Sequence, residues 1–360
     1  MRPATAFTLD PGLSALEPPE ARGLARDQVR LLVAREHRPL RHLRFDALPR
    51  ALRRGDLVVV NTSDTEPAAV DGRRGDGRPV VLHVSGPVPG GDQEVVVELR
   101  TADGRRIADG SAGERIRLPG GTAAILVAGH PDAGVRDGSR LWRARIPVPD
   151  GVPRWLRAVG RPIRYSYLRR RWPLAAHRTL FATAEGEFGS AEMPSAARPF
   201  TPSVLAGLRA HGIGVAKLVL HTGVSSLEAG EVPLPERYRV PASTAAAVNA
   251  VRAAGGRVVA VGTTVTRALE TVADETGRVR AGAGWTDLVL GPQRPARAVT
   301  GLVTGWHEPQ ASHLLLLEAV AGPRLVGRAY AAAVDRGYRW HEFGDSCVLL
   351  PSYPAQPGDQ

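Results

Sequence analysis

The chain has 360 residues, of which 43% are hydrophobic and 23% charged, so it can bury a substantial core and hold two or three domains. Its single cysteine, Cys347, excludes an internal disulfide and a multi-cysteine metal site, and no apolar run approaches the roughly 20 residues that span a bilayer. A formal net charge of +11 favours polyanionic partners, although Lys217 is the only lysine and a coding bias toward arginine is the rival explanation. The N-terminus lacks the apolar segment of a secretory signal, so we expect a soluble cytoplasmic protein.

The first 152 residues predict two kinds of structure. Residues 52–61 predict a turn and then a buried strand that ends at Asn61, because three β-branched residues lie between a Gly-Asp turn and a polar end. Residues 71–152 contain short β-branched segments, most of them flanked by Gly, Pro or Asp. Closely spaced short strands of this kind predict a small antiparallel barrel or sandwich.

Beyond residue 157 the chain predicts alternating helices and strands. The helix at 202–211 has Thr201 as its N-cap candidate and Pro202 at its first position. The other predicted elements are strands at 214–220, 257–261, 287–290 and 299–304 and helices at 241–254, 264–272 and 312–321. This alternation predicts an α/β sheet covered by helices, which the β-rich segment interrupts.

The segment Val258-Val-Ala-Val-Gly-Thr-Thr-Val-Thr-Arg-Ala-Leu-Glu predicts a buried strand that turns into a helix. Ligands of open α/β sheets bind at the carboxyl ends of strands, where helix amides and hydroxyls are available. Gly262, Thr263 and Thr264 are therefore ligand-site candidates, and an ordinary capped turn is the alternative. Arg267 and Glu270, three residues apart on the helix, are expected to pair.

Three further segments place reactive side chains in turns. The turn after residue 304 carries Trp306 and His307, which can stack on a base and transfer a proton. His221 follows a predicted strand, and Asp345 closes a short loop, with His341 and Glu342, before the last predicted strand. Each of these residues also has a structural alternative, namely a helix start, a satisfied histidine or a solvated loop.

The stretch from residue 151 to residue 184 contains no acidic residue. Its arginines are Arg154, Arg157, Arg161, Arg164, Arg169, Arg170, Arg171 and Arg178, interleaved with Trp155, Tyr165, Tyr167 and Trp172. Guanidinium groups suit phosphates and aromatic rings stack on unpaired bases, so the stretch predicts a surface that faces RNA or another anion. The alternative is a basic, solvated loop with a few buried aromatic residues.

In their order along the chain, these motifs resemble the S-adenosylmethionine:tRNA ribosyltransferase-isomerase family of queuosine biosynthesis. The resemblance rests on the segments that begin at Arg53, Leu220, Gly255, Thr286, Leu302 and Tyr338. It implies an α/β fold, with a main α/β domain formed by residues 1–70 and 153–360 and an inserted small antiparallel β-barrel domain formed by residues 71–152.

The resemblance also implies a reaction. The ribosyl part of S-adenosylmethionine, the co-substrate, moves to the aminomethyl group of a 7-deazaguanine in tRNA and rearranges to epoxyqueuosine, with release of adenine and methionine. No metal is implied, and we expect a monomer that binds tRNA and no membrane.

The resemblance places the site residues by their position in the motifs. It implies that Gly262, Thr263, Thr264, Trp306 and Asn61 bind the donor and that His221, His307 and Asp345 lie near the chemistry. The expected RNA-binding residues are Arg164, Arg169, Arg170, Arg171, Tyr165 and Tyr167.

Several polar motifs depart from the family pattern. Asn61-Thr-Ser-Asp replaces an Asn-Asp-Thr-Arg run, and Pro194-Ser-Ala-Ala-Arg-Pro-Phe replaces Pro-Thr-Ala-Gly-Leu-His-Phe. Thr304-Gly-Trp-His-Glu-Pro replaces Thr-Asn-Phe-His-Leu-Pro, and Pro233-Leu-Pro-Glu replaces Met-His-Ser-Glu. Two alternatives follow: a paralogue that uses the same donor or a related nucleoside on a small-molecule acceptor, and a non-catalytic RNA-binding relative.

Overall fold

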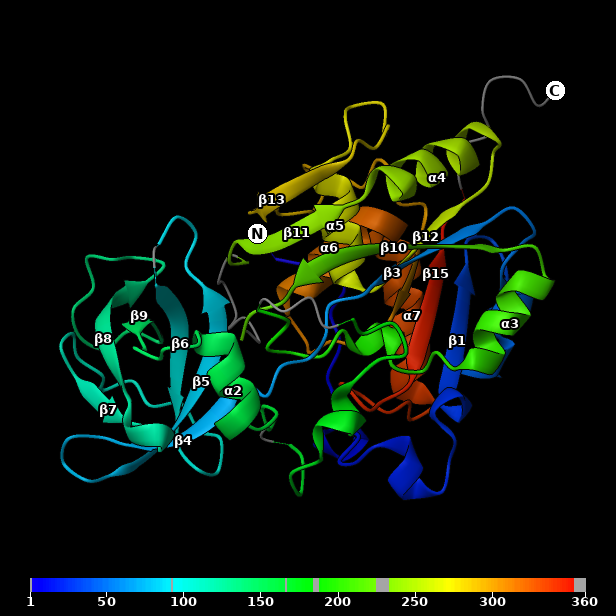
Figure 1. Ribbon diagram of the computed structural model, residues 1–360. Coiled ribbons are helices and arrows are strands. Elements are labelled where there is room, and N and C mark those ends of the chain that lie inside the picture. Colours follow the sequence, from blue (N-terminus) through cyan, green and yellow to red (C-terminus); the bar gives the residue numbers. More distant parts are fainter. Residues whose placement is uncertain (1, 92, 166, 184–187, 225–232, 353–360) are drawn as a thin grey trace.

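The computed structural model describes residues 2–352 except 92, 166, 184–187 and 225–232 (Figure 1). A closed β-barrel lies beside a large mixed sheet that carries helices on both faces (Figure 1). The predicted α/β class with an inserted antiparallel barrel is confirmed. None of the helices in the described part of the chain is long and apolar enough to cross a membrane.

The large sheet has nine strands in the order β13-β11-β10-β3-β12-β14-β15-β1-β2. Their bounds are β1 Arg30–Arg35, β2 Arg41–Arg44, β3 Leu57–Asn61, β10 Gly214–His221, β11 Glu236–Val240, β12 Val258–Val261, β13 Gly282–Thr286, β14 Gly301–Thr304 and β15 Ser346–Leu350. The central strands β10, β3, β12 and β14 run parallel, so their carboxyl ends meet at one edge. Strand β15 is antiparallel to β14, which brings the start of β15 to the same edge.

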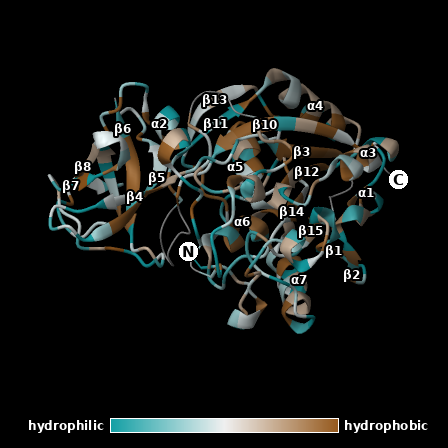
Figure 2. Cartoon of the chain, turned by 60° about the horizontal axis from the view of Figure 1, so that its bottom comes forward, coloured by the Kyte–Doolittle hydropathy of each residue, from teal (hydrophilic) through white to brown (hydrophobic). Residues whose placement is uncertain are grey.

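Helices cover both faces of this sheet and bury two cores. Their bounds are α1 Leu48–Ala51, α3 Pro202–Ala210, α4 Ala242–Ala253, α5 Thr263–Thr271, α6 Ser312–Ala321 and α7 Pro323–Asp335, while α2, Val152–Val159, packs on the barrel. Helices α4 to α7 pack in one core and α1 and α3 in the other. The hydrophobic colouring of the central strands shows why such a sheet must be covered on both sides (Figure 2).

The barrel closes in the order β4-β5-β6-β9-β8-β7 around its own core, which includes the fully buried Trp142. Its strands are β4 Ala69–Arg73, β5 Pro79–Pro87, β6 Glu94–Arg100, β7 Arg115–Arg117, β8 Ala123–His130 and β9 Leu141–Arg145. Helix α2 buries Val152 and Leu156 against the same core. We keep the domain limits at residues 70/71 and 152/153 as a proposal.

Some local predictions were wrong or incomplete. The predicted strand at 287–290 is absent, because β13 lies earlier, at the Gly-rich segment Gly282–Thr286, and the Leu288 carbonyl accepts a hydrogen bond from Arg267 Nε (2.9 Å) instead. The sequence offers Ser243 or Thr244 near the N-cap of the helix predicted at 241–254, but the N-cap of α4 is Pro241, no side chain caps it, and the Thr244 hydroxyl donates to the Lys217 carbonyl (2.5 Å). Thr201 caps α3 as predicted, through a hydrogen bond from the Val204 amide.

Candidate active site

A cavity with about 1040 Å³ of open space lies at the carboxyl ends of β12 and β14. This is the position at which parallel sheets bind ligands. Residues from four separate segments line it, which are 192–196, 261–264, 304–313 and 341–342, together with Tyr165 and Thr222.

The turn from β12 into α5 forms one wall. Gly262 has a φ of 90°, a left-handed conformation that glycine adopts without strain, and it is the N-cap of α5 with no side-chain capping bond. The N-terminus of α5 therefore lies at the cavity wall, together with Thr263 and Thr264. Asn61 does not line the cavity, but its Nδ2 lies 3.4 Å from Thr264 Oγ1 and so helps to position that hydroxyl.

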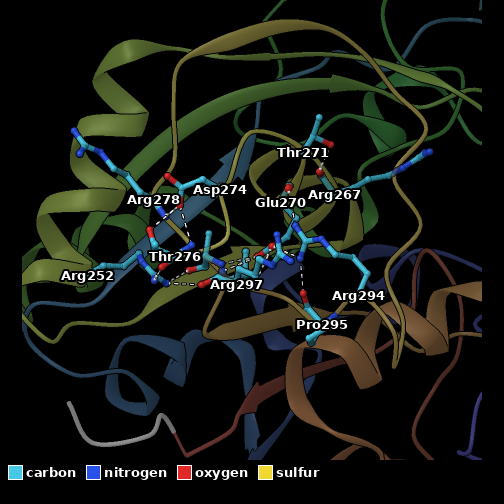
Figure 3. Close-up of polar contacts among 12 residues, drawn as sticks. Arg252, Arg267, Glu270, Thr271, Asp274, Thr276, Arg278, Arg294, Pro295 and Arg297 are labelled. Atoms are coloured by element: carbon cyan, nitrogen blue, oxygen red, sulfur yellow. Dashed lines mark hydrogen bonds and ion pairs between the residues drawn. The ribbon is translucent and has the colours of Figure 1, made fainter. Parts of the chain in front are cut away.

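The far end of α5 is fixed by buried ionic contacts (Figure 3). Glu270 accepts hydrogen bonds from the backbone amides of residues 297–299 at 2.8–2.9 Å and forms an ion pair with Arg294 (3.3 Å). Arg267 instead pairs with Glu236 (2.6 Å) and donates to three backbone carbonyls. The expected Arg267–Glu270 pair is therefore wrong, since each residue ties α5 to a different segment.

Three histidines line the cavity and are neutral near pH 7. His307 and His313 stack with their ring centroids 4.6 Å apart, and the Thr304 hydroxyl lies 3.1 Å from His307 Nε2. Burial lowers the pKa of His307 well below its ordinary value and lowers the pKa values of His313 and His341 to about 4. These rings therefore add no positive charge to the cavity.

Three carboxylates, those of Glu192, Glu308 and Glu342, line the same cavity. Burial raises the pKa of Glu308 and raises the pKa of Glu342 to about 7. Glu342 Oε2 is buried without a hydrogen-bond partner among the described residues, while Glu308 Oε1 lies 3.4 Å from His341 Nε2. The described residues that line the cavity include no lysine or arginine. A protein with a net charge of +11 thus contains an acidic cavity.

A second cavity, with about 720 Å³ of open space, adjoins the first. The two share Glu192, Thr222, Thr263, Thr264 and His313. The leucines of the second cavity, Leu234, Leu288, Leu290 and Leu316, give it a more apolar wall. A ligand that crosses the Thr263–Thr264 turn would therefore meet a polar chamber on one side and an apolar chamber on the other.

The three residues predicted to lie near the chemistry, His221, His307 and Asp345, lie in different places in the structure. His307 lines the acidic cavity, whereas His221 lines a cleft beside the barrel, with its Nδ1 2.8 Å from Ser63 Oγ. Asp345 lies just outside the cavity and accepts hydrogen bonds from Arg30 and from the Arg339 amide at 2.8–3.0 Å. Its carboxylate therefore holds the loop in place.

The donor candidates Gly262, Thr263, Thr264 and Trp306 all line the acidic cavity. The indole of Trp306 is buried and packs against Tyr330 and Trp340. The titratable cavity residues that the sequence did not identify as site residues are Glu192, Glu308, Glu342, His313 and His341. Of these, His341 and Glu342 had a sequence signal because they share a short polar loop with Asp345, and Glu308 had one because it follows His307 in the turn after residue 304.

The acid-free stretch contributes both to the cavity and to the surface. Tyr165 lines the cavity and stacks on Tyr167 (5.7 Å), which stacks on His341 (4.3 Å). Residues 169–171 are exposed arginines, and Arg170 lies 4.0 Å from the ring of Trp172. Arg164 is half-buried and donates to the Leu168 carbonyl (3.0 Å). The aromatic residues of this stretch thus face inward and its arginine run faces outward.

Comparisons with known proteins cover nearly the whole chain. A family model described as queuosine biosynthesis protein matches residues 4–349. The chain is 35% identical to the S-adenosylmethionine:tRNA ribosyltransferase-isomerase of Moorella thermoacetica, over 96% of this chain and 98% of the relative. It is 36% identical to the protein of the same name from Symbiobacterium thermophilum, over 90% and 94% of the two chains. The crystal structure of S-adenosylmethionine tRNA ribosyltransferase from Thermotoga maritima aligns with a TM-score of 0.52 and 26% identity, over 96% of this chain and 99% of that chain.

Proposed function

The chain belongs to the queuosine biosynthesis protein family, and from this premise we propose that it is an S-adenosylmethionine:tRNA ribosyltransferase-isomerase. It moves the ribosyl part of S-adenosylmethionine onto 7-aminomethyl-7-deazaguanine in tRNA and isomerises it to epoxyqueuosine, releasing adenine and methionine. Full-length similarity to enzymes of this name supports that reaction over a small-molecule acceptor or an inactive RNA-binding relative.

The acidic cavity is the observation that carries the donor assignment. S-adenosylmethionine has a cationic sulfonium, and a cation near buried carboxylates is favoured because the local dielectric is low. Glu342, whose Oε2 is buried, supplies such a carboxylate, the exposed Glu308 adds a second one at the cavity wall, and the histidines beside them are neutral. We place the sulfonium in this cavity, with the donor held along Thr263 and Thr264.

The reaction requires a base, because the sulfonium acidifies the hydrogens on the adjacent ribose carbon. Glu342 is the cavity carboxylate whose pKa, about 7, best suits proton transfer at neutral pH. In this step the proton passes to Glu342 and the electron pair of the C–H bond stays on the carbon beside the sulfur. Neutral His307 can hydrogen-bond the departing adenine, while Asp345 acts as a positioning residue.

We propose that the exposed run Arg169, Arg170 and Arg171 contacts tRNA phosphates, because the run lies outside the cavity and carries three positive charges. Arg164 would support this run through its hydrogen bond to the Leu168 carbonyl. Tyr165 and Tyr167 would face the base that enters the cavity. A metal-independent reaction in a cytoplasmic monomer remains part of the proposal and rests on the family resemblance.

The test is a product assay. Purified protein, S-adenosylmethionine and tRNA that carries the 7-aminomethyl-7-deazaguanine precursor should release adenine and methionine in equal amounts and form epoxyqueuosine. The matched control is the same tRNA with guanine at the wobble position. Absence of adenine release from the precursor tRNA would overturn the proposed function.

A further inference from the structure

A cleft between the barrel and the edge of the large sheet is not used by the donor site described above. It contains about 540 Å³ of open space. The barrel contributes β5 and His130 of β8, and the sheet contributes His221, Arg237 and Trp285. The barrel lies beside the β10, β11 and β13 edge in both views (Figures 1 and 2).

The sheet side of the cleft presents one row of side chains. His221 on β10 is paired with Arg237 on β11, and Arg237 is paired with Trp285 on β13. Residues directly paired in an antiparallel ladder point to the same face, so an imidazole, a guanidinium and an indole lie side by side. Arg239, two residues further along β11, extends the same face with a second positive charge.

Two contacts hold the barrel against this row. Ser85 Oγ of β5 accepts a hydrogen bond from the Val224 amide (2.8 Å), just beyond β10. Arg237 Nη2 donates to the Phe188 carbonyl (3.2 Å), and Phe188 packs on the barrel core. The cleft is therefore built by both parts of the fold, and its guanidinium is held in place.

The cleft also adjoins the donor site. It shares Gly223, Leu234 and Glu236 with the apolar cavity, which in turn meets the acidic cavity at Thr263 and Thr264. The cleft, the apolar cavity and the acidic cavity therefore follow one another from the barrel edge to the carboxyl ends of β12 and β14. An RNA that delivers one base to the donor has to place a neighbouring nucleotide near such an entrance.

We propose that this cleft binds an unpaired RNA nucleotide that neighbours the acceptor base, with its base stacked on Trp285 and its phosphate beside Arg237. The RNA identity rests on the proposed function. Trp285 is 38% exposed, which is unusual for an indole in this chain, where Trp142 and Trp340 are fully buried. Unpaired bases stack on such rings, and arginine pairs with phosphate, so the row combines both requirements for single-stranded RNA.

The test is RNA affinity, measured by fluorescence anisotropy with a synthetic anticodon stem-loop RNA and the full-length protein. Trp285→Ala should weaken binding about five- to hundredfold, as expected when one base–aromatic stack is removed. Trp285→Phe keeps a stacking ring and should bind close to wild type. Leu180→Ala removes another exposed apolar side chain, 41% exposed and outside the cleft, and should bind like wild type.

A second variant tests whether the positive charge of Arg237 contacts an RNA phosphate. Arg237→Gln should lower the slope of log affinity against log salt by about one, since one phosphate contact is lost. S-adenosylmethionine binding should stay unchanged in all these variants, which shows that they are folded. Thermal melting should stay unchanged in the Trp285 variants and fall slightly in Arg237→Gln, which also loses the hydrogen bond to the Phe188 carbonyl. Wild-type affinity in Trp285→Ala, or no stem-loop binding by the wild type, would overturn the cleft assignment.

The outcomes separate this inference from the proposed function. Adenine release by the wild type together with undiminished binding by Trp285→Ala would retain the enzyme activity and reject the cleft. Weaker binding by Trp285→Ala without adenine release from precursor tRNA by the wild type would retain the cleft and reject the enzyme activity.

Discussion

Buried carboxylates have different partners in the body of the protein and in the acidic cavity. In the body most of those described are paired with arginine: Glu94 contacts Arg143 and Arg145, and Asp56 contacts Arg257, at distances of 2.5–3.1 Å. In the cavity, the described residues include no hydrogen-bond partner for Glu342 Oε2 and no arginine in the wall. Since an unpaired buried carboxylate is costly, the cavity stores a free-energy penalty that a cationic ligand would relieve.

The largest effect is expected when the charge of the cavity carboxylate Glu342 is removed. Glu342→Gln keeps the side-chain shape and should lower the rate of adenine release about 10²- to 10⁴-fold, because it removes the proposed proton acceptor. Single-turnover assays at saturating S-adenosylmethionine measure this effect. Glu308→Gln, which keeps Glu342, should retain most of the rate, and a wild-type rate in Glu342→Gln would rule out its role as base.

Removing a carboxylate from the body should affect stability and not chemistry. Asp56→Ala leaves Arg257 buried without its partner and should lower the free energy of unfolding by about 3–5 kcal/mol, measured by urea denaturation. Asp103→Ala removes an exposed partner of Arg105 and is the matched control, with little expected change. Equal stability of the two variants would contradict the structural role of the buried pair.

Donor binding should depend on pH in a direction set by Glu342. A bound cation favours the ionised carboxylate, so the affinity for S-adenosylmethionine should rise by up to about tenfold as the pH increases from 6 to 8. Binding near pH 7 should also release protons to the buffer, which calorimetry in buffers of different ionisation enthalpy measures. Glu342→Gln should flatten both effects, and a pH profile unchanged by this substitution would assign the titration to another group.

The same pKa also affects the stability of the ligand-free protein. The pKa of Glu342 is raised to about 7 in the folded state, above its ordinary value of 4.5, so its stabilising contribution is complete below pH 4.5 and is lost as the pH rises through 7. Glu342→Gln should therefore gain about 2–3 kcal/mol on the wild type between pH 5 and 8, since each pKa unit corresponds to about 1.4 kcal/mol. Parallel pH–stability curves for the two proteins would contradict the raised pKa.

The sequence predicted the scaffold of the site better than its charge. The β3 and β12 strands, the Gly262 turn and α5 follow from continuous apolar runs and a glycine, which are local signals. The acidic cavity is not local, because it forms where the loop before β15 meets the turn after β14. Sequence spacing could not show that Glu342 lines this cavity while Asp345 turns toward Arg30.

Backbone conformation explains part of that failure. His341 has a φ of 72°, which is unusual for a residue other than glycine and redirects the chain before Glu342. The edge strand β13 was missed for a related reason: Gly-Ala-Gly-Trp-Thr has little strand propensity, and pairing with β11 holds it. The row formed by His221, Arg237 and Trp285 could therefore be identified only from the register of β10, β11 and β13.

The most direct test of the cationic site compares S-adenosylmethionine with S-adenosylhomocysteine, which lacks the sulfonium charge. Calorimetric titration of the wild type at pH 8 should give at least about tenfold tighter binding of S-adenosylmethionine, since one favourable charge contact is worth about 1.4 kcal/mol or more. The difference should shrink in Glu342→Gln. Equal affinity of the two ligands for the wild type would contradict the assignment of the acidic cavity to the sulfonium.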